Sequence, residues 1–284
     1  MSLGRGGVIM KKNLLLIAVA VLAVSCGKAI KPSQATHDMV EWTFEAPATK
    51  ASLGAGGAFS WSPGDEIAVW NSTESAYVTF RTGTGNGRFS ATAPASANFT
   101  TGAYYPSDIV SGSGVTLPSS YTVDALSSGA GMPMFSPVED DSNLLEFKHL
   151  VAYLAIQAQR LPDTIDRIKV SSSTVSLSGT FSPADIGGGR REIRSVSGNA
   201  AVTIGFATSA GQDISFIIPV PVGEYAITVE AGNVDVSDVL SAETDPVNFL
   251  RGHLYTLSAI VNPDISVSLT SEPYNLEPDS NNWE

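Results

Sequence analysis

The sequence has a single cysteine and few basic side chains, and both shortages limit what the protein can do. One cysteine, Cys26, in 284 residues can form no intramolecular disulfide and has no partner thiol for a structural zinc or iron–sulfur site. Lys and Arg number 16 against 28 Asp and Glu, which gives a net charge of −12. A general nucleic-acid binder needs a basic face to neutralise phosphates, so the composition argues against that class.

The sequence also lacks the residue constellations of an enzyme. Its three histidines, His37, His149 and His253, have no metal-ligand spacing. The glycine-rich stretches 83–87 and 187–189 lack the Lys-Ser/Thr of a phosphate-binding loop, and no G-x-S-x-G nucleophile elbow occurs. We therefore expect no enzymatic activity, no metal and no cofactor, and an envelope hydrolase is the least favoured function.

The N-terminus has the pattern of a targeting segment. Lys11 and Lys12 precede an apolar run of 11 residues, 14–24, which is too short to span a bilayer and has the length of a signal-peptide core. Residues 1–25 are therefore predicted to be a signal peptide. Its natural start is expected at Met10, because the pattern is complete without residues 1–9.

Cys26 acquires a role from this context. The small residues Ala23, Val24 and Ser25 directly before it resemble a bacterial lipobox, although Ala23 stands where Leu is more typical. In such signals the cysteine becomes the lipidated first residue of the mature chain, and several acyl chains anchor it stably. We expect lipid on Cys26, a polar tether over 26–38, and export to the outer membrane. A stray cysteine in an ordinary signal peptide is the alternative.

The rest of the chain has the pattern of an all-β protein. Short segments rich in Val, Ile, Thr, Tyr and Phe are separated by turn clusters of Gly, Pro, Ser, Asn and Asp, which favours sandwiches over βαβ units. The predicted strands are 40–45, 66–70, 76–81, 87–91, 102–105, 144–157, 166–171, 177–181, 201–206, 213–219, 223–231 and 254–261. Residues 144–159 fit a helix equally well. Pro219, Pro221 and Gly223 are expected to form a hairpin turn between their two neighbouring strands.

A Ser- and Gly-rich region, 106–142, divides the strands into two sets. We predict an N-terminal sandwich over 39–142, a C-terminal sandwich over 143–262 and a tail over 263–284. Apolar and polar residues alternate within the tail at 265–269, so it can supply one more strand.

Three local patterns resemble one family when they are taken in order. WTFEAPATKAS (42–52) is followed by FSWSPGDEIAVW (59–70) and later by FKHLVAYLAIQ (147–157). With the lipobox, this series resembles the fimbrillin-like proteins of Bacteroidetes, which include the pilins and pilus-associated lipoproteins of type V pili. The matching residues are Trp61, Gly64 and Asp65 of a W-x-x-G-D motif, and Phe147, Lys148 and His149 of an F-K-H strand start.

The resemblance implies a fold and an assembly mechanism. It implies two transthyretin-like Greek-key β-sandwich domains in tandem and a lipidated precursor at the outer membrane. In polymerising subunits a trypsin-like protease cuts after Arg or Lys and releases the first strand, and a strand of another pilus subunit fills the groove. Here the released strand would be 40–45 and the processing site Lys50, with the tail 263–284 as donor or closing strand.

Each of these residues also has a simpler interpretation. Lys50 can be a solvated loop lysine, and an Arg-specific protease would leave it uncut, which would make the chain an anchor or accessory subunit. Trp61, Gly64 and Asp65 fit a structural turn better than a ligand site. His149, on an apolar strand, fits a core or edge histidine better than a catalytic base.

Two functions follow from the sequence. The first is a structural or adhesive fimbrial subunit, or a pilus-associated surface lipoprotein, that binds other pilus subunits by strand exchange and contacts surface ligands. Thr164, in an Asp-Thr-Ile triplet that resembles a short O-glycosylation motif of Bacteroidetes, is a candidate O-glycosylation site. The alternative is an outer-membrane lipoprotein that binds glycans at exposed aromatic side chains. The candidate aromatic residues are Trp42, Trp61, Trp70, Tyr104 and Tyr105.

Overall fold

The computed structural model gives the fold of the larger of two compact units, Asp38–Glu284. The residues that it describes are 38–47, 49–50, 59–123, 132–139, 142–207, 211–233, 240–262, 264–270 and 272–277. The signal peptide, Cys26 and the tether up to residue 37 lie outside this set, so these expectations stay predictions.

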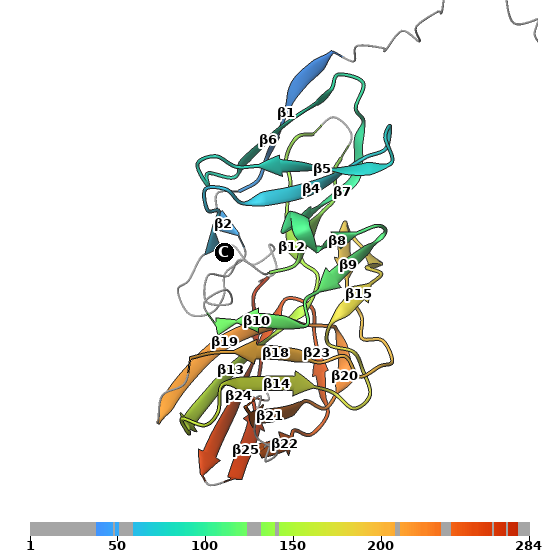
Figure 1. Cartoon of the computed structure of the whole chain (residues 1–284). Helices are drawn as coiled ribbons and strands as arrows, with labels where there is room; N and C mark the ends of the chain where they lie inside the picture. The colour runs from blue at the N-terminus through green and yellow to red at the C-terminus, as the bar shows by residue number, and fades with distance from the viewer. Residues whose placement is uncertain are drawn as a thin grey trace, which may run out of the picture. The chain divides into compact units, whose positions relative to one another are not determined.

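The N-terminal half forms a seven-stranded sheet (Figure 1). Across the sheet the strands are β1 (Met39–Glu45), β6 (Arg88–Pro94), β5 (Ala76–Arg81), β4 (Glu66–Asn71), β7 (Phe99–Tyr105), β11 (Met134–Ser136) and β12 (Lys148–His149). All its pairs are antiparallel. Strand alternation places Ile67 and Val69 of β4 and Phe89 of β6 on the inner face, where they join a core rich in aromatic side chains.

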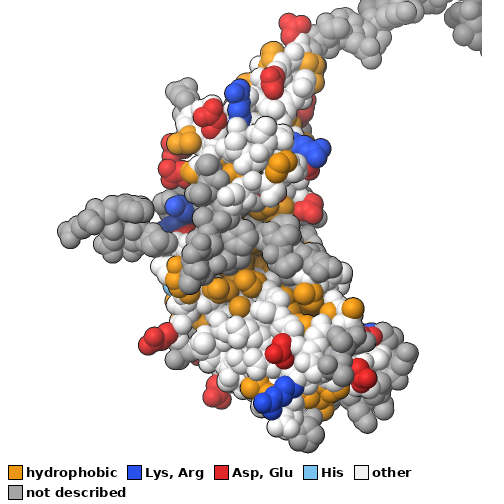
Figure 2. All heavy atoms as spheres, turned by 90° about the vertical axis from the view of Figure 1, so that its left-hand side faces the viewer, with side chains coloured by type: hydrophobic (Ala, Val, Ile, Leu, Met, Phe, Trp, Pro, Cys, Tyr) orange, Lys and Arg blue, Asp and Glu red, His pale blue; other side chains and the backbone are white. Residues whose placement is uncertain are grey.

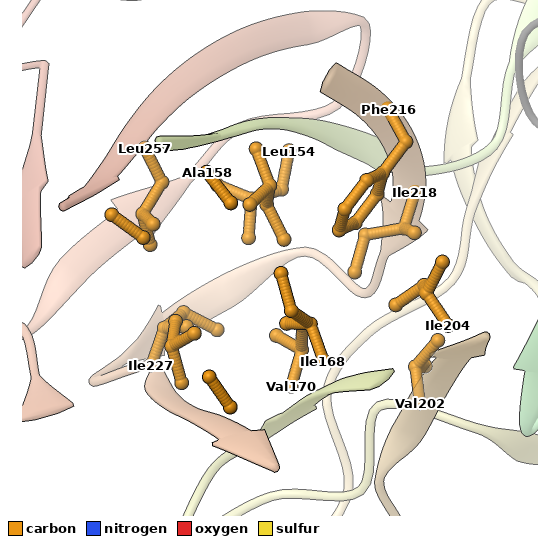
Figure 3. Close-up of a cluster of buried hydrophobic side chains, with 14 of the residues drawn as sticks. Leu154, Ala158, Ile168, Val170, Val202, Ile204, Phe216, Ile218, Ile227 and Leu257 are labelled. Atoms are coloured by element: carbon orange, nitrogen blue, oxygen red, sulfur yellow. The ribbon is translucent and has the colours of Figure 1, made fainter. Parts of the chain in front are cut away.

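Two further sheets form a sandwich in the C-terminal half (Figure 3). One contains β10 (Ser120–Thr122), β18 (Val202–Gly205), β14 (Arg167–Ser171), β21 (Thr228–Gly232) and β22 (Leu240–Glu243). The other contains β19 (Gln212–Val220), β13 (Ala152–Leu161), β24 (His253–Asn262) and β25 (Asp264–Leu269), and β26 (Tyr274–Asn275) also pairs with β24. Figure 3 shows Leu154, Phe216 and Leu257 of the second sheet facing Val170 and Ile204 of the first.

Short ladders complete the fold. They are β15 (Gly179–Phe181) with β9 (Gly114–Leu117) and β8 (Val110–Ser111), β16 (Ala184–Gly187) with β17 (Arg190–Glu192), β2 (Thr49–Lys50) with β3 (Phe59–Ser60), and β20 (Gly223–Tyr225) with β23 (Val247–Phe249). A 3₁₀ helix, η1 (Ser107–Ile109), follows β7. The all-β, sandwich-like fold class predicted from the sequence is confirmed.

The hairpin predicted at 219–223 is wrong. β19 pairs with β13, whereas β21 pairs with β14 and β22, so the two segments belong to different sheets. Their alternating apolar residues, such as Phe216 and Val229, enter the same core from opposite sides. An alternating pattern predicts which face is buried, but it does not tell whether two neighbouring strands pair or face each other.

The segment 144–159 is neither a helix nor one continuous strand. Leu144 forms an isolated bridge with Glu45, β12 joins the N-terminal sheet, and β13 then begins at Ala152 in the C-terminal sandwich. Conversely, β10 comes before β12 in the chain but pairs with β18 of the C-terminal sandwich. The boundary expected between residues 142 and 143 stays a prediction.

Candidate functional site

The strand that the resemblance marks as removable, β1, lies at one edge of the N-terminal sheet (Figure 1). All seven of its residues pair with β6. Phe44 is buried, with its ring centroid 5.1 Å from that of Phe80 and 5.9 Å from that of Phe99. Trp42 packs edge-on against Phe99 at 5.1 Å. β1 therefore covers part of the aromatic core and has one strand partner along its length.

A groove runs along the outer side of β1. It has a volume of about 510 Å³ and is lined by Trp42–Phe44, Ala97–Phe99, Val138, Glu139, Ser142 and Asn143. At one end the strand is bound to the opposite wall, because the Glu45 N–H donates to the Asn143 carbonyl at 2.8 Å and the Leu145 N–H donates to the Glu45 carbonyl at 2.7 Å. Only the C-terminal end of β1 is thus held on both sides by these backbone hydrogen bonds.

Trp61 connects two of the sequence motifs. It is 4% exposed, and its indole Nε1–H donates to the Pro47 carbonyl at 2.8 Å. Its ring contacts three others edge-on, those of Phe89, Tyr105 and Phe147, at 4.8, 5.2 and 5.6 Å between centroids. The contact with Phe147 joins the W-x-x-G-D motif to the F-K-H motif across the sheet.

Gly64 and Asp65 form the turn that leads into β4. Gly64 has φ +93°, a backbone conformation that favours glycine. The Asp65 carboxylate accepts a hydrogen bond from the Ser62 N–H at 2.7 Å and one from the Tyr105 hydroxyl at 3.1 Å. Burial, followed by the Asp65 charge, raises the pKa of Tyr105, so this hydroxyl keeps its proton. The geometry of these two residues is that of a turn fixed to β7.

His149 is fully buried beside the ion pair between Arg251 and the tail residue Glu277. Its Nδ1 lies 2.8 Å from the Tyr153 hydroxyl, and its Nε2 has no hydrogen-bond partner among the described residues. The backbone N–H of His149 donates to Glu277, whose carboxylate is bound by the guanidinium of Arg251 at 2.7 Å. Arg251 also donates to the His149 carbonyl at 2.8 Å. Glu277 of the tail is thereby connected to β12 and to the residues just before β24.

Burial lowers the pKa of His149 from 6.5 to about 4; the charge of Glu277 raises this pKa by a smaller amount, and the charge of Arg251 lowers it further. Between pH 6.5 and 4 the unfolded chain binds a proton at this residue that the folded chain does not, so stability falls as pH falls. We expect the free energy of unfolding to drop by about 2 kcal/mol between pH 7 and pH 5 from this histidine alone. Urea unfolding at both pH values measures this drop.

Two variants assign the drop to His149. In His149→Gln the pH dependence should flatten by that amount, whatever the variant's stability at pH 7. In His253→Gln, which leaves His149 in place, it should persist. Stopping at pH 5 keeps the comparison above 4.5, the ordinary pKa of Glu277. An unchanged pH dependence in His149→Gln contradicts the assignment.

The remaining candidate residues lie in different parts of the chain. Lys50 is in β2, whose backbone pairs with β3. Thr164 is exposed in the turn between β13 and β14. Of the aromatic residues taken as exposed glycan contacts, Trp61, Tyr104 and Tyr105 are buried, so that expectation is wrong for all three. Tyr104 and Tyr105 lie in β7, whereas Trp61 lies in the segment between β3 and β4. All three are buried by contacts with residues far away in the chain, which a turn-rich sequence does not reveal.

Across the described ranges, no three His, Cys, Asp or Glu side chains gather in a group that could hold a metal ion. No helix in the same part of the chain is long and apolar enough to cross a membrane. Sequence reasoning missed Arg251 and Glu277, which are separated from His149 by 102 and 128 positions.

Comparison with known proteins identifies fold neighbours. No family model and no curated protein matches the sequence. One neighbour is the crystal structure of a candidate cell adhesion protein from Bacteroides ovatus, whose sequence is 16% identical to this one. The match covers 83% of this chain and 98% of that protein, with a TM-score of 0.54. A candidate cell adhesion protein from Bacteroides uniformis is 15% identical over 82% of this chain and 98% of its own, with a TM-score of 0.46.

A third neighbour, the tip fimbrial protein Mfa3 from Porphyromonas gingivalis, is 9% identical over 81% of this chain and 99% of its own, with a TM-score of 0.36. These three neighbours are bacterial proteins described as cell adhesion or fimbrial proteins. The likeness to the Bacteroides ovatus protein extends over most of both chains and concerns the fold. This chain is similar in its all-β, sandwich-like architecture to that candidate cell adhesion protein.

Proposed function

We propose that the protein is an adhesive fimbrial subunit or pilus-associated surface lipoprotein, attached to the outer membrane through Cys26 and assembled by β-strand exchange. The observation that carries the proposal is the place of β1, an edge strand whose aromatic side chains enter the core and which borders an open groove. The fold neighbours, which are described as cell adhesion or fimbrial proteins, support the adhesive role in this proposal.

Loss of β1 would create the need for a replacement strand. Its departure exposes Phe80 and Phe99 where Phe44 had covered them, and it leaves the outer edge of β6 without hydrogen-bond partners. Burying one such aromatic side chain is worth about 1.5–3 kcal/mol. An incoming strand with apolar residues at alternate positions restores both the ladder and the core, which is the physics of β-augmentation.

A cut after Lys50 would break the covalent link between β1 and the strands that follow it. Lys50 comes five residues after β1. Within the described chain, the backbone over 39–50 is held by the ladder of β1 with β6, by hydrogen bonds of Glu45 and Ala46, and by the two-residue pair β2–β3. A protease needs an extended, unpaired backbone, and a two-residue ladder opens at little cost compared with a seven-residue one. Cleavage after Lys50 is therefore proposed to release residues up to Lys50 together with the lipid.

Mass spectrometry of the mature N-terminus tests this proposal in cells that export the protein and assemble fimbriae. Material sheared from the surface is expected to begin at Ala51. Lys50→Ala should abolish that N-terminus and leave a chain that begins at lipidated Cys26. The matched control Lys31→Ala removes a basic residue upstream of β1 and should leave the start at Ala51.

One outcome contradicts strand release. If wild-type assembled material retains lipidated Cys26, β1 stays in place and the protein is an anchor or accessory subunit. In the tail, β25 is an edge strand that pairs with β24 of its own chain. The tail strand therefore has two candidate roles: it closes the C-terminal sandwich of its own chain, or it is donated to another subunit.

A further inference from the structure

A second hollow lies away from β1, where three ladders meet. It has a volume of about 480 Å³. Its walls come from β4, β5 and β7 of the N-terminal sheet, from the turn between β8 and β9, and from β17. The lining residues are Trp70, Ser75, Ala76, Tyr77, Thr101, Tyr104, Gly112, Ser113 and Arg191. Nothing in the strand-exchange mechanism uses these residues.

One wall of the hollow is aromatic. The ring of Tyr77 lies 5.0 Å from that of Trp70 and 6.0 Å from that of Tyr104, edge-on in both cases. Trp70 and Tyr77 are half-buried, so part of each ring is open to a ligand. Among the described residues, neither the indole N–H of Trp70 nor the hydroxyl of Tyr77 has a hydrogen-bond partner. The wall thus offers flat apolar surface and two free polar groups, which is a typical lining for a small-molecule site.

The other wall carries the guanidinium of Arg191, which is held in place by Tyr104 and Phe135. Arg191 donates through Nη1 to the Tyr104 hydroxyl, and its Cζ lies 4.5 Å above the centre of the Phe135 ring. Phe135 can lie there because Gly102 has no side chain, since a Cβ at that position would be 2.2 Å from the Phe135 ring. The arrangement fixes the guanidinium, so little conformational entropy is lost when its remaining N–H groups bind an acceptor.

No carboxylate neutralises Arg191 within the described part of the chain. The acidic side chains of its own hairpin are engaged elsewhere: Glu192 pairs with Arg194 at 2.6 Å, and Asp185 accepts a hydrogen bond from the Gly187 N–H. Among the described residues that line the hollow, Arg191 alone is charged. A fixed, half-buried cation without a counter-ion favours an anionic group on a ligand.

The net charge limits how acidic that ligand can be. The protein carries −12 overall, and on the one face that Figure 2 draws, acidic side chains in red lie among isolated basic ones in blue. Such a surface repels a dense polyanion, which would need a basic face. A ligand with one carboxylate next to an uncharged, ring-shaped body suits the site better.

We infer that this hollow binds an acidic sugar. The ring of the sugar would lie against Trp70 and Tyr77, and its carboxylate would accept hydrogen bonds from Arg191 in the two-pronged geometry that guanidinium favours. The hydroxyls of Ser75, Thr101 and Ser113 lie at the exposed rim, within the lining, for contacts with sugar hydroxyls. The inference gives the proposed adhesin a ligand class, but it does not depend on strand exchange.

Titration of the full chain with a matched pair of sugars tests it. The acidic probe is 3′-sialyllactose and its neutral counterpart is lactose, each followed by calorimetry. We expect the acidic probe to bind about tenfold more tightly, which is the factor that one charge-assisted contact supplies. Arg191→Gln should remove this preference, and Trp70→Ala should remove measurable binding of both sugars.

Matched controls keep the result specific. Arg190→Gln changes the neighbouring arginine, which is exposed and does not line the hollow, and Tyr274→Ala removes an exposed aromatic side chain elsewhere. Both should bind like the wild type. Since Arg191 packs on Phe135 and its loss could impair folding, the wild-type chain provides a second measurement. The indole N–H resonance of Trp70, assigned with Trp70→Phe, should shift on addition of 3′-sialyllactose.

Three outcomes would overturn the inference. They are equal affinity for the acidic and neutral sugars, a Trp70 resonance that does not move, and tighter binding of a short acidic peptide such as acetyl-aspartyl-glycine. The last would mean that the hollow recognises a peptide carboxylate instead of a sugar. Processing at Lys50 should be unaffected in Arg191→Gln, so failure here and failure of strand exchange are distinguishable.

Discussion

Replacement of Trp61 by alanine is expected to destabilise the protein by about 3–5 kcal/mol, the range for deleting a large aromatic side chain from a packed core. The variant removes three edge-on ring contacts and the hydrogen bond from the indole to Pro47. It also opens a void between β6, β7 and the segment before β12, which these strands cannot all close at once. Urea unfolding at pH 7, followed by circular dichroism, measures the change.

Two further variants separate the parts of this loss. Trp61→Phe keeps an aromatic ring and loses the Nε1–H donor, so it should lie between the wild type and Trp61→Ala. Tyr274→Ala removes a ring that is 50% exposed and should change stability by less than about 0.5 kcal/mol. A loss below about 1 kcal/mol in Trp61→Ala would show that the motif tryptophan does not pin the sheet.

Arg251→Met is expected to cost about 3–5 kcal/mol, because it leaves the Glu277 carboxylate buried without its partner. In the wild type, burial opposes the charged form of Glu277, but the hydrogen bonds and charge of Arg251 outweigh it and lower the pKa of the carboxylate. Among the described residues, the hydrogen bond that this carboxylate keeps in the variant is the one from the His149 N–H. The same urea titration measures the loss.

The double variant Arg251→Met/Glu277→Leu should recover part of that loss, since no buried charge remains unpaired. The matched control is Lys169→Met, which breaks an ion pair with Glu230 at a much more exposed position. It should cost no more than about 1 kcal/mol. If Arg251→Met behaves like Lys169→Met, the tail is not held through this pair. Retention of the full loss in the double variant would assign it to packing instead of charge.

The sequence predicted strands well where they alternate and pairings poorly where they depend on distant segments. The segments 66–70 and 76–81 agree with β4 and β5, because each has a strong β pattern between turn residues. The hairpin at 219–223 failed because the alternation of Phe216 and Val229 is the same for paired and facing strands. Local pattern contains no information on which of the two occurs.

The site residues follow the same division. Trp61, Gly64 and Asp65 are neighbours in the chain, so their turn could be anticipated from the motif. Arg191 contacts Tyr104 across 87 positions, and Glu277 contacts His149 across 128. No spacing rule connects residues so far apart, and their types alone indicate only solvated charges. These contacts exist because the fold brings β17 to β7 and the tail to β12.

The pairing of β13 with β24 determines when the C-terminal half can fold. These strands run parallel, with Tyr153 opposite Leu254, and β13 lies between β24 and β19. The partners are about a hundred residues apart, so a large loop must close before the central strand acquires its second neighbour. Such high contact order places folding in the millisecond-to-second range. A chain synthesised from the N-terminus therefore cannot complete this sandwich until β24 has been made.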